Sequence, residues 1–522
     1  MVPRRRAPRL TGFAVGYPRG VKPTLFVLLV ALAACGDDDD APATPDAARP
    51  DAGAPDAPVL VAAFPAGFLW GTGNAPYQVE GGLSGTDWFA WEGCARCSGD
   101  HADDGPDFWN RYDADFALAE SGGHNTIRIG IDWSRVFPAG MDAPADAGAV
   151  ARYNQILAAA RARGLSPMVT LHHFATPTWL AGGWLDPTAA ARFAAWAGFC
   201  AGEFGAEVDW WITINEPIVY VLSGYLSGDF PPGHVADVPG ALGVVDAMLA
   251  GHAQAYDAIH DVDRIDADGD GRAAWVSIAG HQRVFRGLVP GTDDDRAASV
   301  LASIANHAFF DALVLGRRDL NFDLDFDDEG EQGLDALAGR LDFLGVNYYG
   351  ISLVQSFGPT APPPLVGLPM MNDLAELGFD APETDFGWSI YPQGFTQVLE
   401  ELRPYGLPVV ITENGLADAD DNQRPRFLID HLRAVADAIA DGIDVRGYYH
   451  WTLVDNFEWA AGFCPKFGLA SFDAGSAERT RTARGSLAVY RQIIEAGGIS
   501  AELVAQHPSY PAPGLGCPRT GM

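Results

Sequence analysis

Eight short runs rich in Val, Ile, Leu and aromatic residues recur along the chain, and helical patterns separate them. The runs are nearly continuous in apolar residues, which is typical of strands buried on both faces of a parallel sheet. Eight such strands alternating with helices predict one α/β domain, a (β/α)8 TIM barrel with long βα loops. The runs span residues 68–76, 126–133, 167–173, 209–217, 274–281, 341–350, 408–415 and 445–453.

A doubly wound α/β sheet is the alternative, but it would place a glycine-rich phosphate loop after the first strand. Gly71-Thr72-Gly73 does not continue as G-x-G-x-x-G. The barrel is therefore favoured. Its helices include residues 151–164 and 426–442, in which Gly164 and Gly442 are predicted to end the helix.

The N-terminus has the features of an export signal. Basic residues precede an apolar run from Leu25 to Ala34, which is about half as long as a bilayer span requires. The tetrad Leu32-Ala33-Ala34-Cys35 resembles the lipobox of bacterial lipoproteins, in which the cysteine becomes the lipidated first residue. An ordinary signal peptide with an incidental cysteine is the alternative.

Four segments are therefore predicted. Because a stretch rich in Ala, Pro and Asp cannot bury enough apolar surface to fold, a tether should follow the signal peptide. We expect an exported protein, lipid-anchored to the bacterial cell envelope through Cys35 and facing the periplasm or the exterior. The segments are a lipoprotein signal peptide (1–34), the tether (35–63), the barrel domain (64–500) and a C-terminal tail (501–522).

Charge and composition exclude some classes of protein. The chain has 522 residues, of which 48% are hydrophobic, so it is too apolar for a disordered protein. The 34 basic and 68 acidic residues give a formal net charge of −34. Because a large negative charge repels phosphate backbones, we expect no nucleic-acid partner.

Polar and aromatic residues interrupt the apolar runs where the predicted strands end. In a barrel the carboxyl ends of all strands meet at one mouth, so such residues are candidates for catalysis. Two of them are glutamates, Glu216 in INEP and Glu413 in ITENG. The alternative, two glutamates paired with buried arginines, is disfavoured by their position at the ends of strands four and seven.

Paired carboxylates across a cleft are the machinery of glycoside hydrolysis. One carboxyl must donate a proton to the leaving oxygen, which requires a raised pKa, whereas the other must stay ionised to attack the sugar carbon. Further motifs occur in the same order along the chain. They are FLWGTGNAPYQVEGG (68–82), TLHHFATPTWL (170–180), TINEP (213–217), NYYG (347–350), ITENG (411–415), WTLVDNFEWAAGFCPKFGL (451–469) and RTARGSLAVYRQII (481–494).

By these motifs the chain resembles the family one glycoside hydrolases, the β-glucosidase family, from about Phe64 to Ile494. The resemblance implies that Glu216 is the acid/base and Glu413 the nucleophile, supported by Arg128. It implies no organic cofactor, and small-molecule or oligosaccharide β-glycosides as substrates. The substrate-binding residues that it implies are Gln78, His173, Asn215, Asn347, Tyr349, Trp451, Glu458, Trp459 and Phe467.

The Glu458-Trp459 pair bears on the sugar that is bound. Family members that cleave 6-phosphoglycosides carry Ser at the first of these positions, so the acid here favours unphosphorylated sugars. Lys466 is the nearby cation that could soften this preference. Phe174 stands where many members have Trp, which leaves the fine preference among sugars open.

Two further groups of residues could bind a metal ion or form disulfides. Asp266, Asp268 and Asp270 in DADGDG fit the first half of a calcium loop, but the twelfth position is Ser277 rather than Glu, so a structural calcium competes with a solvated acidic turn. Cys94 and Cys97 favour a local disulfide, and Cys200 lies on an apolar helical pattern. The pairing of Cys464 and Cys517 stays open.

The sequence thus predicts a lipid-anchored retaining β-glycosidase that removes terminal β-D-glucosyl or related residues through a covalent glycosyl-enzyme. One alternative is a cell-surface glycan-binding lipoprotein with little activity. The survival of both carboxylates argues against it. A transglycosidase on the same scaffold is the other alternative, which the residues cannot distinguish.

Overall fold

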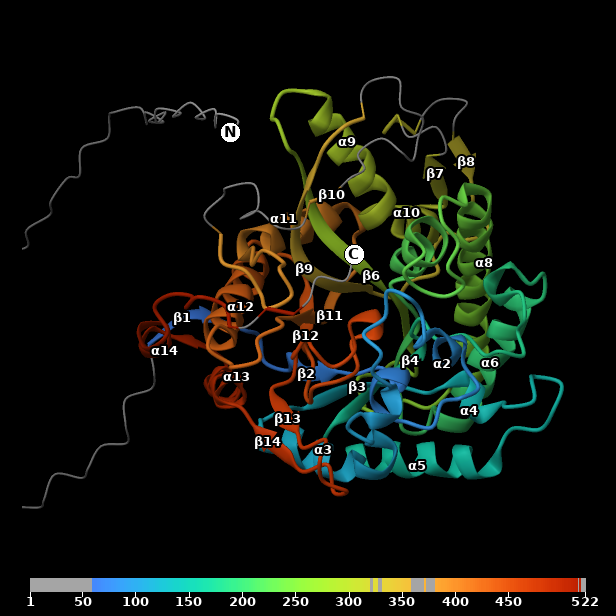
Figure 1. Cartoon of the computed structure of the whole chain (residues 1–522), viewed down its shortest axis with the longest axis horizontal. Helices are drawn as coiled ribbons and strands as arrows, with labels where there is room; N and C mark the ends of the chain where they lie inside the picture. Colours follow the sequence, from blue (N-terminus) through green and yellow to red (C-terminus); the bar gives the residue numbers. More distant parts are fainter. Residues whose placement is uncertain are drawn as a thin grey trace, which may run out of the picture. The chain divides into compact units, whose positions relative to one another are not determined.

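Eight parallel strands hydrogen-bond in the order β9-β11-β12-β2-β3-β4-β5-β6, and a further pairing of β6 with β9 closes the ring (Figure 1). Each strand overlaps one of the eight predicted runs, although β6 and β9 continue beyond theirs, so the predicted (β/α)8 barrel is confirmed. The strands are β2 (Leu69–Gly73), β3 (Thr126–Gly130), β4 (Ser166–His172), β5 (Trp210–Asn215), β6 (Trp275–Gly287), β9 (Leu344–Val354), β11 (Val409–Gly415) and β12 (Val445–Trp451).

The computed structural model leaves the predicted signal peptide and Cys35 outside the described residues. The residues that it describes are 59–319, 323–326, 331–357, 370–371, 381–514 and 516–517.

Helices cover the outside of the ring, and each barrel strand is followed by at least one (Figure 1). The predicted glycine ends are present: Gly164 and Gly442 have φ of +74° and +90°. The longer helices are α3 (Phe108–Ser121), α5 (Ala147–Ala162), α6 (Ala189–Phe204), α8 (Val238–Val262), α9 (Asp293–Ala302), α11 (Pro392–Leu402), α12 (Arg424–Ala440) and α13 (Gly485–Ala496).

Shorter elements fill the βα loops and the ends of the domain. The short helices are α1 (Pro76–Val79), α2 (Asp87–Trp91), α4 (Trp133–Val136), α7 (Pro217–Val221), α10 (Ala308–Phe310), α14 (Ala501–Gln506), the π-helical η3 (Leu222–Ser227), η4 (Ser303–His307) and η5 (Asp311–Leu315), and the 3-10 turns η1 (Ala102–Asp104), η2 (Gly183–Leu185), η6 (Arg403–Tyr405) and η7 (Trp459–Ala461). The short strands are β1 (Leu60–Ala63), β7 (Arg317–Asp319), β8 (Glu331–Gly333), β10 (Met370–Met371), β13 (Ala470–Phe472), β14 (Arg481–Ala483) and β15 (Gly498–Ser500).

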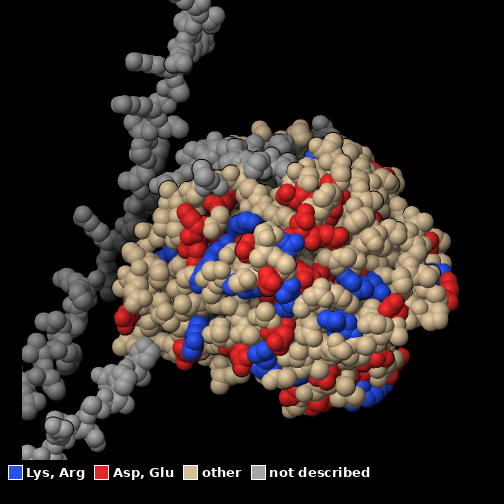
Figure 2. All heavy atoms as spheres, turned by 60° about the horizontal axis from the view of Figure 1, so that its bottom comes forward, with Lys and Arg blue, Asp and Glu red and all other residues tan. Residues whose placement is uncertain are grey.

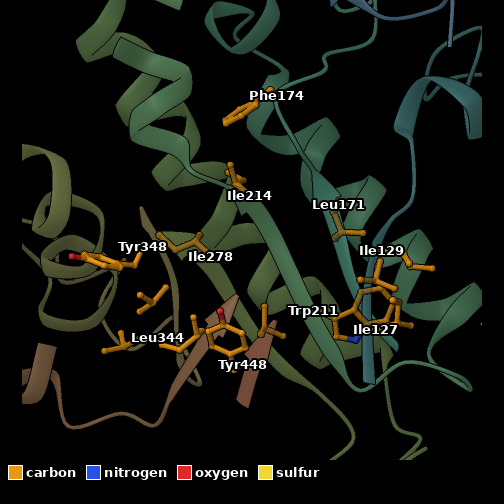
Figure 3. Close-up of a cluster of buried hydrophobic side chains, with 14 of the residues drawn as sticks. Ile127, Ile129, Leu171, Phe174, Trp211, Ile214, Ile278, Leu344, Tyr348 and Tyr448 are labelled. Carbon is orange, nitrogen blue, oxygen red and sulfur yellow. The ribbon is translucent and has the colours of Figure 1, made fainter. Parts of the chain in front are cut away.

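The strands are apolar throughout because both of their faces are buried. In β3, Ile127 and Ile129 belong to the cluster between strands and helices, and Figure 3 shows them beside Trp211 of β5. The residue between them, Arg128, is also fully buried but belongs to the polar interior of the barrel. Successive side chains of a strand point to opposite faces, so the cation of Arg128 lies buried inside the ring.

Strand β1 pairs antiparallel with β15. The predicted tether and tail boundaries at residues 63 and 501 are therefore corrected. The folded domain begins with β1 and continues through α14, whose Leu503 is buried. The backbone N–H groups of β1 and β15 need partners, and each strand supplies them to the other.

One helical stretch, Asp293–Leu315 (α9 to η5), is long and apolar enough to cross a membrane by length and composition alone. Half of its apolar window is buried inside the fold, where α9 packs on β6. Its apolar character is therefore explained by packing in the helical ring.

Charged side chains of both signs are intermixed on the face shown in Figure 2, and over the described residues of that face no continuous basic patch appears. The expectation of no nucleic-acid partner stays a prediction.

Disulfides join Cys94 to Cys97, as predicted, and Cys464 to Cys517. The second bond ties the C-terminal segment to the loop that follows β12. Cys200 is a free thiol buried in α6, which confirms its assignment to the core.

The carboxylates of Asp266, Asp268 and Asp270 lie within 4.8 Å of one another in an exposed turn before β6. They already accept hydrogen bonds: Gly269 N in the same turn donates to Asp266 over 2.7 Å, and the indole of Trp275 in β6 donates to Asp270 over 2.7 Å. Ser277 is buried in β6 with its hydroxyl bonded to the Phe343 carbonyl. It therefore does not supply the twelfth-position ligand of a calcium loop, and a structural calcium at the three aspartates stays a prediction.

Candidate active site

A cavity of about 410 Å³ lies at the carboxyl ends of the barrel strands. The strand ends and the loops after them bring most of the predicted site residues to its wall. Those residues are His173, Asn215, Glu216, Tyr349, Glu413, Trp451, Glu458, Trp459 and Phe467.

Glu413, near the end of β11, is held by two donors, one on each carboxylate oxygen. Arg128 donates to Oε1 over 2.6 Å, and the Tyr349 hydroxyl donates to Oε2 over 2.9 Å. Charge-assisted donors at these distances fix the orientation of the carboxylate. The glycine of the ITENG motif is also explained, because a Cβ on Gly415 would lie 2.0 Å from the Trp451 carbonyl oxygen.

Glu216 follows β5 directly and adopts a left-handed conformation with φ of +41°. This conformation costs a non-glycine residue about 1–3 kcal/mol and is typical of functional positions. Its backbone N–H donates to the Ala279 carbonyl over 2.7 Å. Asn347 Nδ2 donates to Glu216 Oε1 over 3.1 Å, and His281 Nδ1 lies 3.1 Å from the same oxygen. Because both contacts are made to Oε1, Oε2 is the oxygen suited to carry a transferable proton.

Asn215 links the two carboxylates. Its Oδ1 accepts from Arg128 over 2.7 Å and from Asn347 over 3.1 Å, and its Nδ2 donates to His173 Nε2 over 3.0 Å. Burial and the charge of Arg128 hold the pKa of His173 well below its ordinary value. The neutral ring can therefore accept from Asn215 and keep its proton on Nδ1.

The pocket beside these groups combines a carboxyl with indole rings. Gln78 Nε2 donates to the Phe457 carbonyl over 2.8 Å and to Glu458 Oε2 over 3.3 Å. The rings of Trp451 and Trp459 each stack on His173, with centroids 5.7 and 5.9 Å away. Such a wall offers flat faces for the ring of a sugar and a carboxyl for its hydroxyls.

Two acids of the cavity, Glu413 and Glu458, have raised pKa values. Burial raises the pKa of Glu413 to about 7, because desolvation and the charge of Glu216 outweigh the lowering by Arg128 and Tyr349. Burial, followed by the charge of Glu413, raises the pKa of Glu458 to about 8. Glu413 is thus partly protonated in the empty site at neutral pH, although its donors favour the ionised form.

This predicts the acid limb of the pH profile. Only the ionised Glu413 can attack, so on the acid side of the profile kcat/KM should fall about tenfold per unit as the pH drops below about 7. Tyr349→Phe removes a hydrogen bond that favours the ionised form, so the limb should move to higher pH. An acid limb near the ordinary Glu value of about 4.3 would contradict this and show that Arg128 dominates over burial.

The structure places some predicted residues behind the cavity wall. Gln78, Arg128 and Asn347 are fully buried and reach the cavity through the side chains that they hold. Asn347 contacts Glu216 and Asn215, and its predicted role in binding substrate stays a prediction.

The wall also holds residues that were not predicted, among them His281 and Trp388. His281 ends the fifth predicted strand, so the strand-end pattern could have identified it, whereas Trp388 lies in a loop with no such signal. Phe174 also lines the cavity, with φ of +64° and its ring centroid 5.1 Å from that of Trp459.

Comparison with known proteins agrees with the arrangement of two glutamates in a barrel mouth. Glycosyl hydrolase family 1 matches residues 60–499. A β-galactosidase of Pyrococcus woesei is 31% identical, covering 84% of this chain and 98% of that protein. Beta-glucosidase A of Thermotoga maritima is 31% identical, covering 80% and 95%. The crystal structure of the β-glycosidase of Thermosphaera aggregans superposes with a TM-score of 0.74 at 30% identity, covering 85% and 99%.

Proposed function

This chain belongs to glycosyl hydrolase family 1 and is a retaining β-glycosidase, and from that premise we propose that its substrates carry an unphosphorylated terminal β-glucosyl group, with β-galactosyl groups also accepted. The observation that carries the proposal is one cavity with two differently held glutamates. Glu413 lies between a cation and a hydroxyl, and Glu216 lies between an amide and an imidazole. Glu458 beside Trp459 supplies the pocket for a neutral sugar.

In the first step, a Glu413 oxygen attacks the anomeric carbon while Glu216 gives its proton to the glycosidic oxygen. The bond from carbon to the leaving oxygen breaks, the alcohol departs, and a glycosyl ester on Glu413 remains. Arg128 and Tyr349 keep the carboxylate oriented before attack.

In the second step, Glu216 takes a proton from water, and the water oxygen attacks the anomeric carbon from the vacated side. The ester bond breaks and returns Glu413 to its carboxylate form. Two displacements at one carbon restore the β configuration. Asn215 lies between Arg128 and His173 in a position to contact the sugar next to the reacting carbon.

The test is a panel of aryl glycosides read by proton NMR. We expect cleavage of the β-glucoside and the β-galactoside, with the β-anomer of the free sugar appearing first. The α-glucoside serves as the control and should not be cleaved. Selective cleavage of some other glycone would overturn the proposed specificity.

We also propose that the enzyme acts outside the cytoplasmic membrane, anchored by lipid on Cys35. The lipobox-like tetrad and the Ala/Pro/Asp-rich stretch that follows it support this proposal.

Cys35→Ala should therefore move the enzyme from the membrane fraction to the soluble fraction, because Cys35 supplies the proposed anchor. Activity in the two fractions is the measurement, and Cys200→Ala, which alters a buried core thiol, is the control. A mature Cys35→Ala protein that stays in the membrane fraction would contradict the lipobox interpretation.

A further inference from the structure

One side of the cavity is walled by aliphatic side chains that no step of the mechanism uses. It lies beyond Glu216, where the loop after β5 and the helices after β6 line the cavity. The first of these, α7 with η3, contributes Ile218, Val219, Leu222 and Leu226, and the second, α9 with η4, contributes Leu301, Ile304 and Ala305.

The spacing of these residues gives each helix one apolar stripe. Ile218, Leu222 and Leu226 follow one another at intervals of four residues, as do Leu301 and Ala305. Residues four apart share a helix face. Leu222 and Leu226 remain only half-buried because their stripe borders the cavity rather than other side chains.

Both stretches contain a π-helical segment where they meet the cavity, η3 and η4. Such segments are rare overall, but those that occur often lie at functional sites. Their wider turn shifts side chains off the regular helical face. Here the wider turns fall in the stretches that carry Leu226 and Ile304 on the wall.

The charged side chains Asp229 and Arg283 on the cavity wall already have protein partners. Asp229 accepts from Arg96 over 2.6 Å, and Arg283 donates to Ser352 over 3.1 Å. If a second sugar lay against the aliphatic stripes, leucine and isoleucine side chains would replace the water around its hydroxyls, and those hydroxyls would lose their hydrogen bonds. Burying unpaired hydroxyls is unfavourable, whereas burying methylene groups is favourable.

Resting on the proposed function, we propose that the leaving group is an aliphatic alcohol, the apolar part of an amphiphilic β-glycoside, rather than a second sugar. Glu216 directly precedes α7, which begins the first stripe, and lines the same cavity, so it can donate its proton to such an alcohol. The alcohol leaves with that proton, and its chain lies between η3 and η4.

The experiment is a series of methyl, butyl, hexyl and octyl β-glycosides below their micelle concentrations, compared with a disaccharide of the same glycone. The glycone is the one that the aryl panel selects. We expect kcat/KM to rise about two- to fourfold per methylene from butyl to octyl, and the octyl glycoside to exceed the disaccharide.

Leu222→Gln and Leu226→Gln should reduce the ratio of octyl to methyl kcat/KM about tenfold, because each places an amide in the stripe. Leu185→Gln makes the same change at a surface leucine that is 42% exposed and absent from the cavity wall, and should keep the ratio.

A binding measurement tests the aliphatic leaving group independently of the proposed glycosidase activity. In Glu413→Gln, where chemistry is blocked, calorimetry should show tighter binding of the octyl than of the methyl glycoside. Activity without any chain-length dependence, or a preference for the disaccharide, would overturn the aliphatic leaving group and leave the glycosidase intact. Equal binding of octyl and methyl glycosides would overturn it even if the aryl panel failed.

Discussion

Glu413→Gly should lower the hydrolysis of aryl β-glucosides by about 10⁴-fold or more, because it removes the atom that attacks the sugar. Sodium azide or formate should then restore part of the activity toward an activated glycoside. The small anion can occupy the space of the lost carboxylate, where the Arg128 guanidinium and the Tyr349 hydroxyl now lack their acceptor.

The configuration of the rescued product identifies the role of the residue. Azide that enters from the side of Glu413 displaces the leaving group once, so the product is the α-glycosyl azide. Glu216→Gly is the matched control. There Glu413 still forms the glycosyl ester with an activated substrate, and azide opens it from the opposite side to give the β-glycosyl azide. A β-azide from Glu413→Gly would refute its assignment as nucleophile.

Stability must be measured alongside activity. Removing one member of a buried ion pair costs about 3–5 kcal/mol, and the side chain of Arg128 is fully buried. Part of this cost is offset because the Glu413 carboxylate is itself destabilised in the folded protein. Desolvation and the charge of Glu216 raise its pKa, and the variant no longer bears this destabilisation. Glu413→Gln keeps an oxygen for Arg128, so loss of activity in that variant with an unchanged Tm separates chemistry from folding.

The barrel and both glutamates could be predicted because they depend on local pattern. A strand buried on both faces must be apolar, so a polar residue at its end, such as Glu216, indicates a site. His281 obeys the same rule and was available from the sequence.

Other features depend on tertiary contacts that no local pattern encodes. Asn347 reaches Glu216 because the ring brings the ends of β9 and β5 together. The pairing of β1 with β15 joins the two ends of the domain, and the bond between Cys464 and Cys517 joins positions 53 residues apart. The sequence of the aliphatic stripes does not differ from that of a helix packed in a protein core. Only the fold shows that these stripes border a cavity.

The second large effect is discrimination against phosphate. We expect kcat/KM for an aryl β-glucoside to exceed that for its 6-phosphate by at least about 10³-fold, since like charges in a desolvated site cost several kcal/mol. Four acids line the cavity, and Glu216, Glu413 and Glu458 are those of the predicted site. Lys466, which could have paired with phosphate, is not on the cavity wall, and its Nζ lies 5.9 Å from the centre of the Phe463 ring.

Glu458→Ser should raise the ratio of phosphorylated to neutral kcat/KM about 10- to 100-fold, because it removes the acid nearest to the sugar pocket that plays no part in the mechanism. Glu495→Ser, on the surface of α13, is the control and should leave the ratio unchanged.

The pH dependence adds an independent check. Glu458 has a pKa raised to about 8 and the phosphate has a second pKa of about 6, so lowering the pH neutralises both partners of the repulsion. The preference for the neutral sugar should therefore weaken as pH falls from 8.5 to 6. The loss of ionised Glu413 over the same range affects both substrates and cancels in the ratio. Equal kcat/KM values for the two substrates at pH 8.5 would contradict the assignment of Glu458 to the sugar pocket.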